Sequence, residues 1–335
     1  MNASTDFRTN LLRTVQAGVP LAERPFHEIG EKLGHSERSV IDEFVALSSE
    51  KILREISAVL EGSALGYESA LVAGSIPEDR LERTVEIINA HPTVSHNYLR
   101  NHDYNLWFTI AVPPNMGLGR TLELLTEETG ADAFHPLRRS HTFKIGVNFD
   151  PESMKNKTAV SASSPVAPFD ADEREVRLLR ALQTPLPLTE RPFDALGESI
   201  GVSGSELIEL GNEHLGGVIR RYVGTLRHRK LGVRENGMVV WCVAPERLEA
   251  VGERLARAPE VSHCYARNGI KGFPYTLYSM LHGPTRESCH ELASYLSGEV
   301  GIDDYAVLFS VREFKKQRLR YFLPELDRWW DERVN

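Results

Sequence analysis

The sequence has little of what marks several large classes of protein. It holds three cysteines in 335 residues, Cys242, Cys264 and Cys289, and no two of them form a C-x-x-C pair. That spacing argues against a structural zinc site and against covalently attached haem. A sparse, odd set of thiols also suits a reducing compartment.

Long apolar runs and an excess of basic charge are missing as well. No apolar stretch approaches the roughly 20 residues that cross a bilayer, and residues 1–13 lack the basic head and apolar core of a signal peptide. We therefore expect a cytoplasmic protein with no membrane partner. The net charge of −8 disfavours nonspecific contact with nucleic acid, although a local basic patch could still bind an anion.

The organising feature is an internal duplication at an offset of 167 residues. The segment from Leu11, LLRTVQAGVPLAERPFHEIGEKLG, matches the segment from Leu178, LLRALQTPLPLTERPFDALGESIG, at 13 of 24 positions. The same offset aligns residues 94–101, VSHNYLRN, with residues 261–268, VSHCYARN. A register shared over about 90 residues shows that the chain contains two copies of one unit.

Composition and pattern divide each copy into two domains. Residues 151–172 are rich in Ser, Ala and Pro and are predicted to be a linker between the copies. The predicted domains are 1–62 and 63–150 in copy one, and 173–232 and 233–335 in copy two.

The first domain of each copy shows short helical patterns joined by tight turns. In copy one they cover Thr9–Ala17, Pro25–Leu33 and Ser36–Leu47, with Pro25 at a first helical position and Gly34 as a stop. Ser36 is the expected N-cap of the third helix. These helices, followed by Ile52-Leu53-Arg54, predict a winged helix-turn-helix domain.

The second domain of each copy alternates strand-like and helical periodicity. The order β-α-β-β-α-β predicts a ferredoxin-like domain, so the fold class is α+β. The predicted elements are Tyr67–Gly74, Glu78–Ala90, Val94–Arg100, Leu106–Val112, Leu118–Thr129 and Ala133–Phe149 in copy one, and Met238–Ala244, Pro245–Arg257, Val261–Arg267, Tyr275–Leu281, Arg286–Glu299 and Tyr305–Val311 in copy two.

This order of domains resembles the Lrp/AsnC transcriptional regulators. Three motifs resemble the siroheme decarboxylases more closely: residues 94–100, VSHNYLR; residues 104–109, YNLWFT; and residues 310–316, SVREFKK. Copy one resembles one subunit of that heteromeric enzyme, and copy two, with PYTLYSMLHG at residues 274–283, resembles the other.

The resemblance implies an activity and an arrangement. Such an enzyme removes two acetate carboxyls of siroheme as carbon dioxide to give 12,18-didecarboxysiroheme, for haem or for the haem of nitrite reductase. It needs no added cofactor, because the iron belongs to the substrate. Regulator-type ferredoxin-like domains pair sheet against sheet, so we expect an intramolecular pseudo-dimer; a homodimer of the fused chain is compatible with this.

Two other functions are compatible with the pattern. A DNA-binding regulator needs basic residues on its third helix, yet Ser203–Glu213 carries three acidic residues and no basic one. The basic residues of that copy come later, in the presumed wing, where they could still grip DNA: Arg220, Arg221, Arg227, Arg229 and Lys230. A non-catalytic tetrapyrrole sensor would bind siroheme and release no carbon dioxide.

Siroheme carries eight carboxylates, so a site for it needs cations to bind them, an acid, and flat apolar walls. His96 and His263 are the expected acids, with Tyr98 and Tyr265 beside them, because alternate residues share one face of a strand. The expected substrate-binding residues are Arg100, Arg267, His102, Asn105, Trp107, Arg138, Arg139, His141, Lys144, Tyr275, His282, Arg312, Lys315 and Lys316.

No metal of the protein's own is expected, and the residues leave the ligand of the substrate iron open among His96, His102, His263 and His282. Each candidate also has a structural interpretation. Histidines and tyrosines on strands are commonly satisfied sheet residues, Trp107 fits a core, and basic last strands often deter aggregation at sheet edges. The twin His-x-Tyr-x-Arg favours function, because both copies keep the polar triplet where the residues between them differ.

Overall fold

The computed structural model describes residues 3–149, 156–160, 167–227 and 235–334, and the chain divides into two compact units. We call residues 1–65, 147–158 and 165–232 the helical unit. The remainder, residues 66–146, 159–164 and 233–335, is the barrel unit. Both helix-turn-helix copies therefore belong to one unit and both ferredoxin-like copies to the other, so the chain groups its domains by type.

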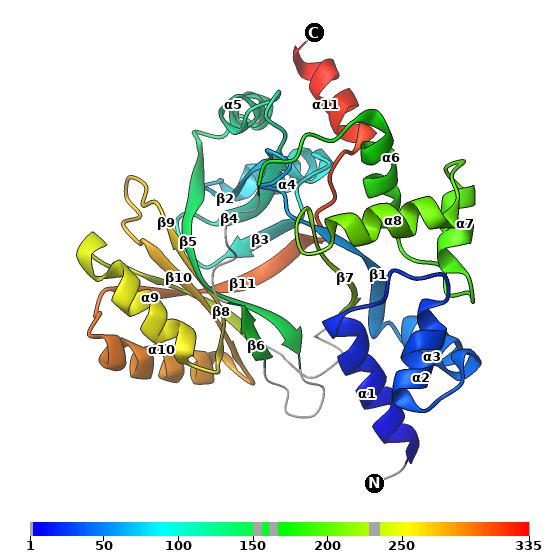
Figure 1. The fold of residues 1–335 in the computed structure, drawn as a ribbon. Helices are drawn as coiled ribbons and strands as arrows, with labels where there is room; N and C mark the ends of the chain where they lie inside the picture. The colour runs from blue at the N-terminus through cyan, green and yellow to red at the C-terminus, as the bar shows by residue number, and fades with distance from the viewer. Residues whose placement is uncertain (1–2, 150–155, 161–166, 228–234, 335) are drawn as a thin grey trace. The chain divides into compact units, whose positions relative to one another are not determined.

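Three helices of each copy build the helical unit (Figure 1). They are α1 (Ala3–Ala17), α2 (Pro25–Leu33) and α3 (Glu37–Ser49), then α6 (Glu173–Leu182), α7 (Pro192–Glu198) and α8 (Gly204–His214). The expected signals are confirmed: Pro25 starts α2, Gly34 ends it in the left-handed conformation at φ 73°, and the Ser36 side chain accepts the Ser39 N–H.

The strand after the third helix differs from the expected wing. Strand β1 (Leu53–Leu60) pairs antiparallel with β7 (Ile219–Leu226), its counterpart in the other copy. Backbone bonds of 2.8 Å from Val19 N to Tyr222 O and from Leu186 N to Ile56 O also join the copies. Each strand would be an unpaired edge in a single copy, so pairing with the duplicate satisfies its backbone groups.

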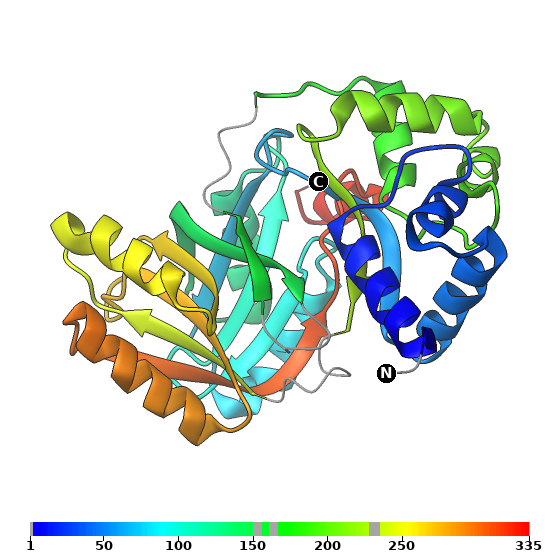
Figure 2. The same cartoon turned by 60° about the horizontal axis from the view of Figure 1, so that its bottom comes forward.

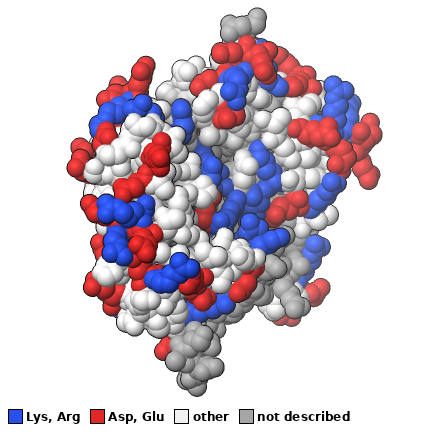
Figure 3. All heavy atoms as spheres, turned by 90° about the vertical axis from the view of Figure 1, so that its right-hand side faces the viewer, with Lys and Arg blue, Asp and Glu red and all other residues white. Residues whose placement is uncertain are grey.

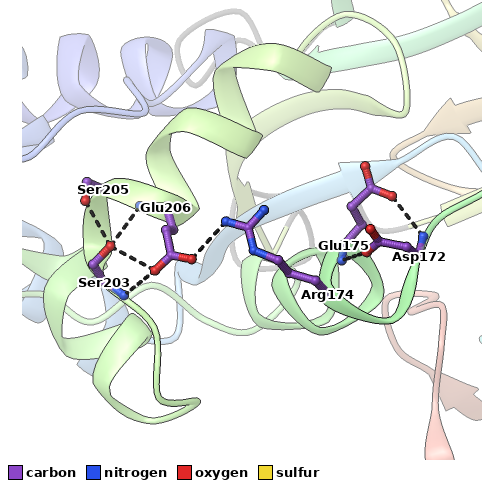
Figure 4. A network of polar contacts seen from close by, with 6 residues as sticks. All are labelled: Asp172, Arg174, Glu175, Ser203, Ser205 and Glu206. Atoms are coloured by element: carbon purple, nitrogen blue, oxygen red, sulfur yellow. Dashed lines mark hydrogen bonds and ion pairs between the residues drawn. The ribbon is translucent and has the colours of Figure 1, made fainter.

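Helices α6 and α8 begin with capping boxes that an ion pair links (Figure 4). Asp172 and Glu175 exchange bonds at the start of α6, and Ser203 and Glu206 do so at the start of α8. Arg174 donates to Glu206 at 2.8 Å. Hydrogen bonds from Arg174 first, then from Ser203, lower the pKa of Glu206 to about 2.

In the barrel unit each copy follows the expected βαββαβ order. Copy one has β2 (Glu68–Gly74), the 3-10 helix η1 (Glu78–Arg80), α4 (Leu81–Ala90), β3 (His96–Arg100), β4 (Leu106–Val112), α5 (Leu118–Thr129) and β5 (Phe134–Phe149). Copy two has β8 (Glu235–Trp241), the 3-10 helix η3 (Pro245–Arg247), α9 (Leu248–Arg257), β9 (Val261–Arg267), β10 (Leu277–Gly283), α10 (Arg286–Val300) and β11 (Tyr305–Lys316).

The strands of the two copies join edge to edge in one continuous sheet. The sequence-based prediction was two sheets that only pack face to face. Among the described residues the order is β2-β4-β3-β11-β8-β10-β9-β5-β6, and β2 also pairs with β5. The first part of β5 pairs with β2 and its later part with β9, while β11 divides in the same way between β8 and β3. The long last strand of each copy thus pairs with the edge strand of the other copy. As a result, eight of these strands form a closed barrel without open edges.

Helices cover the outside of the barrel, and side chains fill the inside. Figures 1 and 2 show α9 and α10 side by side against the strands of copy two. The outward faces of the strands form one apolar core with α4 and α5 and another with α9 and α10. The inward faces form a third core: Ala73, Trp107, Leu137, Met238, Val240, Phe273, Tyr278 and Leu308.

Two segments differ from the sequence-based prediction. The predicted linker contains a strand, β6 (Asn156–Val160), beside β5, while residues 151–155 and 161–166 lie outside the described residues. A C-terminal helix, α11 (Pro324–Val334), was not predicted, and its Trp329 packs into the core of copy one. Within the described ranges, every helix is too short or too polar to cross a membrane.

Candidate functional site

The twin His-x-Tyr-x-Arg motif faces the inside of the barrel in both copies. On β3 the intervening Asn97 points to the helical side, where its Nδ2 donates to Asn89 Oδ1 of α4 at 3.0 Å. Tyr98 stands opposite Trp107, a member of the interior core. On β9 the intervening Cys264 and Ala266 belong to the outer core of copy two. Because side chains alternate along a strand, the histidine, tyrosine and arginine of both copies line the interior.

The two histidines lie at the same mouth of the barrel, at the start of their strands. His96 Nδ1 lies 3.0 Å from Ser95 Oγ, which lies 2.7 Å from Thr109 Oγ1. In copy two His263 Nδ1 lies 2.9 Å from Ser262 Oγ. Both imidazoles are half-buried, so a ligand at this mouth can reach them.

The hydrogen-bond network around His263 is longer than the one around His96. Ser262 Oγ lies 2.6 Å from His282 Nε2, and His282 Nδ1 lies 2.5 Å from Asn236 Oδ1. His282 is thus bound through both ring nitrogens, which disfavours its expected part as an iron ligand. The strand register places Ala111 and Ser69 at the corresponding positions of copy one, where no such chain of side chains can form.

Arg100 is buried inside the barrel, and Arg267 is half-buried there. Arg100 is 7% exposed and donates from Nη1 to Leu308 O at 2.9 Å, while Arg267 donates to Leu137 O at 2.8 Å. Burial lowers the pKa of each guanidinium to about 10. Their carbonyl acceptors lie on β11 and β5, the strands that close the other copy. This placement favours a structural role for both arginines over contact with a large substrate.

Each arginine also stacks on the tyrosine of its own motif. The guanidinium carbon of Arg100 is 5.6 Å from the centre of the Tyr98 ring. That of Arg267 is 5.4 Å from Tyr265 and 5.6 Å from Tyr278. The cation–π contacts hold each motif tyrosine between the arginine of its own motif and the histidine at the mouth.

Lys144 and Lys315 bind the ends of helices in the opposite copy. Lys144 Nζ donates to Ala258 O at the end of α9, at 2.8 Å, and Lys315 Nζ donates to Asn89 O at the end of α4, at 2.7 Å. The last carbonyls of a helix have no partner within it and carry partial negative charge, so an ammonium group stabilises them. Burial lowers the pKa of both lysines. These contacts indicate a role in joining the copies.

His102 lies at the other mouth of the barrel from His96. Its Nδ1 accepts the Tyr104 N–H at 2.9 Å, and burial lowers its pKa. It lines a small polar cavity of about 330 Å³ together with Ser75, Asp103, Tyr104, Asp132, Ala133, His135 and Gly272. The volume is at the low end for ligand pockets. The sequence-predicted residues therefore divide between two mouths and do not form one cluster.

Trp107 and Asn105 serve the fold. Trp107 is 1% exposed in the interior core, where its Nε1 donates to Tyr104 O, which favours the core interpretation over a pocket wall. Asn105 accepts the Ile76 N–H and donates to Ile76 O, which occupies its amide. Tyr275 is half-buried against Phe273, and burial, followed by Asp304, raises its pKa.

The remaining basic candidates are exposed on the last strands. Arg138 pairs with Glu68 and Arg312 with Glu82. His141 packs on Phe143, and Arg139 lies 5.8 Å from the centre of the Tyr265 ring. Lys316 is in register with His96 across β11 and β3. Of these, Arg139 and Lys316 lie closest to the motif residues inside the barrel.

Sequence reasoning missed Ser95, Ser262 and Asn236, which hold the histidines. A signal for the serines was present, because Ser precedes His in both copies of the motif. Asn236 carries no such signal, since β8 approaches β10 only in the folded sheet. In the described part of the chain, no group of three or more His, Cys, Asp or Glu side chains is placed to hold a metal ion.

Comparison with known families finds each domain type twice. The AsnC-like ligand binding domain matches residues 64–144 and 230–315. The siroheme decarboxylase NirDL-like HTH domain matches residues 9–54 and 175–220. These matches confirm the duplication and its two domain types.

Relatives and a solved structure cover nearly the whole chain. It is 37% identical to a siroheme decarboxylase of Hydrogenobacter thermophilus, over 97% of this chain and 98% of that one. A siroheme decarboxylase beta subunit of Methanosarcina barkeri is 40% identical over 44% of this chain and 99% of its own length. The crystal structure of the siroheme decarboxylase NirDL in complex with an iron-uroporphyrin III analogue matches with a TM-score of 0.78 and 34% identity, over 97% of both chains.

Proposed function

Because the chain belongs to the siroheme decarboxylase family, we propose that it converts siroheme to 12,18-didecarboxysiroheme by releasing two acetate carboxyl groups as carbon dioxide. The observation that carries the proposal is the extent of the match, which runs through both copies. The similar structure that holds an iron-uroporphyrin III analogue supports a tetrapyrrole as the substrate. The activity would class the protein as a carboxy-lyase.

The chemistry requires one proton for each acetate. The bond between the methylene carbon and the carboxylate breaks, carbon dioxide leaves, and the electron pair stays on the carbon and the macrocycle. A proton then converts the carbanion to a methyl group, so the step balances without an oxidant or an added cofactor. A positioned acid that delivers this proton typically accelerates such a step by roughly a hundred to ten thousand times.

His96 and His263 are the residues that we assign to this proton transfer. Both are half-buried at one mouth of the barrel, and a serine hydroxyl orients each ring. The rings of Tyr98 and Tyr265 lie next to them on the same inner face, with ring centres 6.1 Å and 6.0 Å from those of the histidines. Arg139 and Lys316 are exposed near these motifs and supply cations for the substrate's carboxylates.

The test is anaerobic incubation of the purified protein with siroheme, followed by mass spectrometry of the tetrapyrrole. Loss of two carboxyl groups is expected. Binding of siroheme without loss of carbon dioxide would instead identify a sensor, and the unchanged substrate with no binding would exclude both functions.

Single-turnover decarboxylation by His96→Ala, His263→Ala and the double variant then tests the assigned acids. We expect each single variant to slow the reaction and the double variant to abolish most of it. Siroheme binding is measured in every variant. A double variant that binds siroheme and reacts at the parent rate would remove both histidines from the mechanism.

A further inference from the structure

We propose that His282 and Ser262 form a proton relay that serves His263, and that copy one has no counterpart of it. The inference rests on the proposed function, because it concerns the proton that decarboxylation consumes. It assigns His282 as a positioning and proton-supplying residue that acts through Ser262, without contact between His282 and substrate.

Four side chains from three strands make a continuous chain of hydrogen bonds. Asn236 of β8 meets His282 of β10 at 2.5 Å, His282 meets Ser262 of β9 at 2.6 Å, and Ser262 meets His263 at 2.9 Å. Ser262 is 1% exposed, whereas both histidines are half-buried. The hydroxyl that connects the two rings is therefore shielded from water, which favours transfer along the chain over exchange with solvent.

The chemical nature of the two ends gives the chain a direction. The Asn236 oxygen can only accept, so His282 Nδ1 carries a hydrogen in either charge state. When His282 is an imidazolium, its Nε2 also carries a hydrogen and donates to Ser262 Oγ. The Ser262 hydroxyl then donates to His263 Nδ1, which places the hydrogen of neutral His263 on Nε2.

Protonation of the substrate reverses the two hydrogen bonds that involve Ser262 and leaves the bond from His282 to Asn236 unchanged. His263 gives its Nε2 hydrogen to the carbanion and takes the Ser262 hydrogen at Nδ1. Ser262 in turn takes the Nε2 hydrogen of His282. His282 ends neutral, the substrate carbon gains one hydrogen, and His263 changes tautomer without becoming an imidazolate. One proton has moved from His282 to carbon, and charge is balanced.

The siroheme reaction gives such a relay a use, because each substrate consumes two protons. Copy one has Ala111 where copy two has His282 and Ser69 where copy two has Asn236, while Ser95 instead contacts Thr109. The other interior positions of β8 hold the uncharged Met238 and Val240, and β9 contributes Tyr265 and Arg267. His282 is therefore the added proton store of copy two, and the two copies are unequal as acids.

The experiment compares His282→Gln and Ser262→Ala with the parent in single-turnover decarboxylation. Glutamine bonds to both Asn236 and Ser262 but cannot carry the proton. We expect both variants to bind siroheme with the parent affinity and to decarboxylate about a hundredfold more slowly, the low end of the range for a positioned acid. The matched control is Ser279→Ala, which removes a buried serine of β10, the strand of His282, that binds Trp241 on the helical side.

Chemical rescue separates proton supply from mere support of the fold. Added imidazole should restore a large part of the rate in His282→Ala and none in Ser262→Ala, because only the former keeps the hydroxyl link to His263. Parent rates in His282→Gln, or a Ser279→Ala variant slowed as much as Ser262→Ala, would overturn the relay. A parent protein that releases no carbon dioxide would instead refute the proposed function.

Discussion

At the residue scale, the same motif gives its three side chains different environments. His96 and His263 are half-buried at the barrel mouth, and Arg100 is only 7% exposed. Arg267 is half-buried, and its guanidinium binds Leu137 O of β5. The difference follows from position along a strand, because each residue adds about 3.3 Å of depth. The arginines are thus placed where the last strands cross from one copy to the other, and the histidines where a ligand can enter.

The first prediction concerns Arg100. Arg100→Ala removes the bond to Leu308 O and leaves a cavity in the barrel, so we expect it to lower the free energy of unfolding by about 2–4 kcal/mol. Arg100→Met keeps most of the volume and should cost less. Urea unfolding at neutral pH measures both. Unchanged unfolding midpoints together with lost siroheme affinity would return Arg100 to the substrate site.

The second prediction concerns His91, which follows α4. Burial first, then Lys315 and Arg333, lowers its pKa from 6.5 to about 3. Because the folded pKa lies below the unfolded one, the stability contributed by neutral His91 is complete above pH 6.5. It is lost as the pH falls from 6.5 towards 3.

His91→Asn should make the free energy of unfolding less dependent on pH. An amide oxygen can accept the Thr93 hydrogen bonds that His91 Nδ1 now accepts, and it does not titrate. The measurement is the free energy of unfolding of parent and variant between pH 4 and pH 7. Parallel curves would show that other groups cause the acid sensitivity.

At the scale of elements, β5 and β11 carry most of the link between the copies. Each pairs with one strand of its own copy and one of the other, and each carries a lysine that binds a helix end of the other copy. The basic residues that the sequence offered for carboxylate binding therefore include two lysines that bind the carbonyls of helix ends. A helix end and a carboxylate attract the same ammonium group, so residue type alone cannot separate these roles.

The third prediction is that Lys144→Met and Lys315→Met lower stability by about 1–3 kcal/mol each while siroheme affinity stays at the parent value. The reason is that each leaves helix-end carbonyls without their ammonium partner. Arg138→Ala is the matched control, because its exposed pair with Glu68 should be worth at most about 1 kcal/mol. A loss of siroheme affinity without loss of stability would contradict this assignment.

At the scale of the whole molecule, duplication supplies both halves of each unit. The barrel needs strands from both copies, and β1 needs β7. The fourth prediction is that residues 1–160 and 167–335 expressed apart do not give folded monomers, because each would expose open sheet edges and half of an apolar interior. Co-expression should give a one-to-one complex with parent-like circular dichroism. A stable monomer of either fragment would refute this.

The fifth prediction is the absence of sequence-specific DNA binding. The exposed residues of α8 include Glu209 and Glu213 and no Lys or Arg, and Arg38 on α3 pairs with Asp42. Arg220, expected in a wing, lies on β7 near Glu61, and Arg229 and Lys230 are outside the described residues. Figure 3 shows Lys and Arg gathered in the middle of the face it presents, with Asp and Glu along its margins.

Without a basic helix to neutralise phosphates, nonspecific affinity should also be low. A mobility-shift titration against the DNA upstream of the protein's own gene, at physiological salt, measures this. Nanomolar, sequence-dependent binding would show that the regulator function was retained.

The sequence by itself determined the duplication, the type and order of most elements, and the pair of motifs that faces the barrel interior. These features can be read from the sequence directly: the repeat at an offset of 167 residues, the alternation along β3 and β9, and caps such as Ser36 and Gly34. Alternation along a strand fixes which residues share a face, so His96, Tyr98 and Arg100 could be grouped before any fold was known.

Only the tertiary structure decided how deep each residue lies and what it contacts. The pairing of β5 with β9 and of β11 with β3 depends on strand edges distant in sequence, so barrel closure left no local signal. The same long-range pairing places Arg267 against Leu137 O and Lys144 at the end of a helix. It also brings Asn236 and His282 to Ser262. A side chain's chemistry is set by its residue type, but its role depends on which distant strand lies beside it.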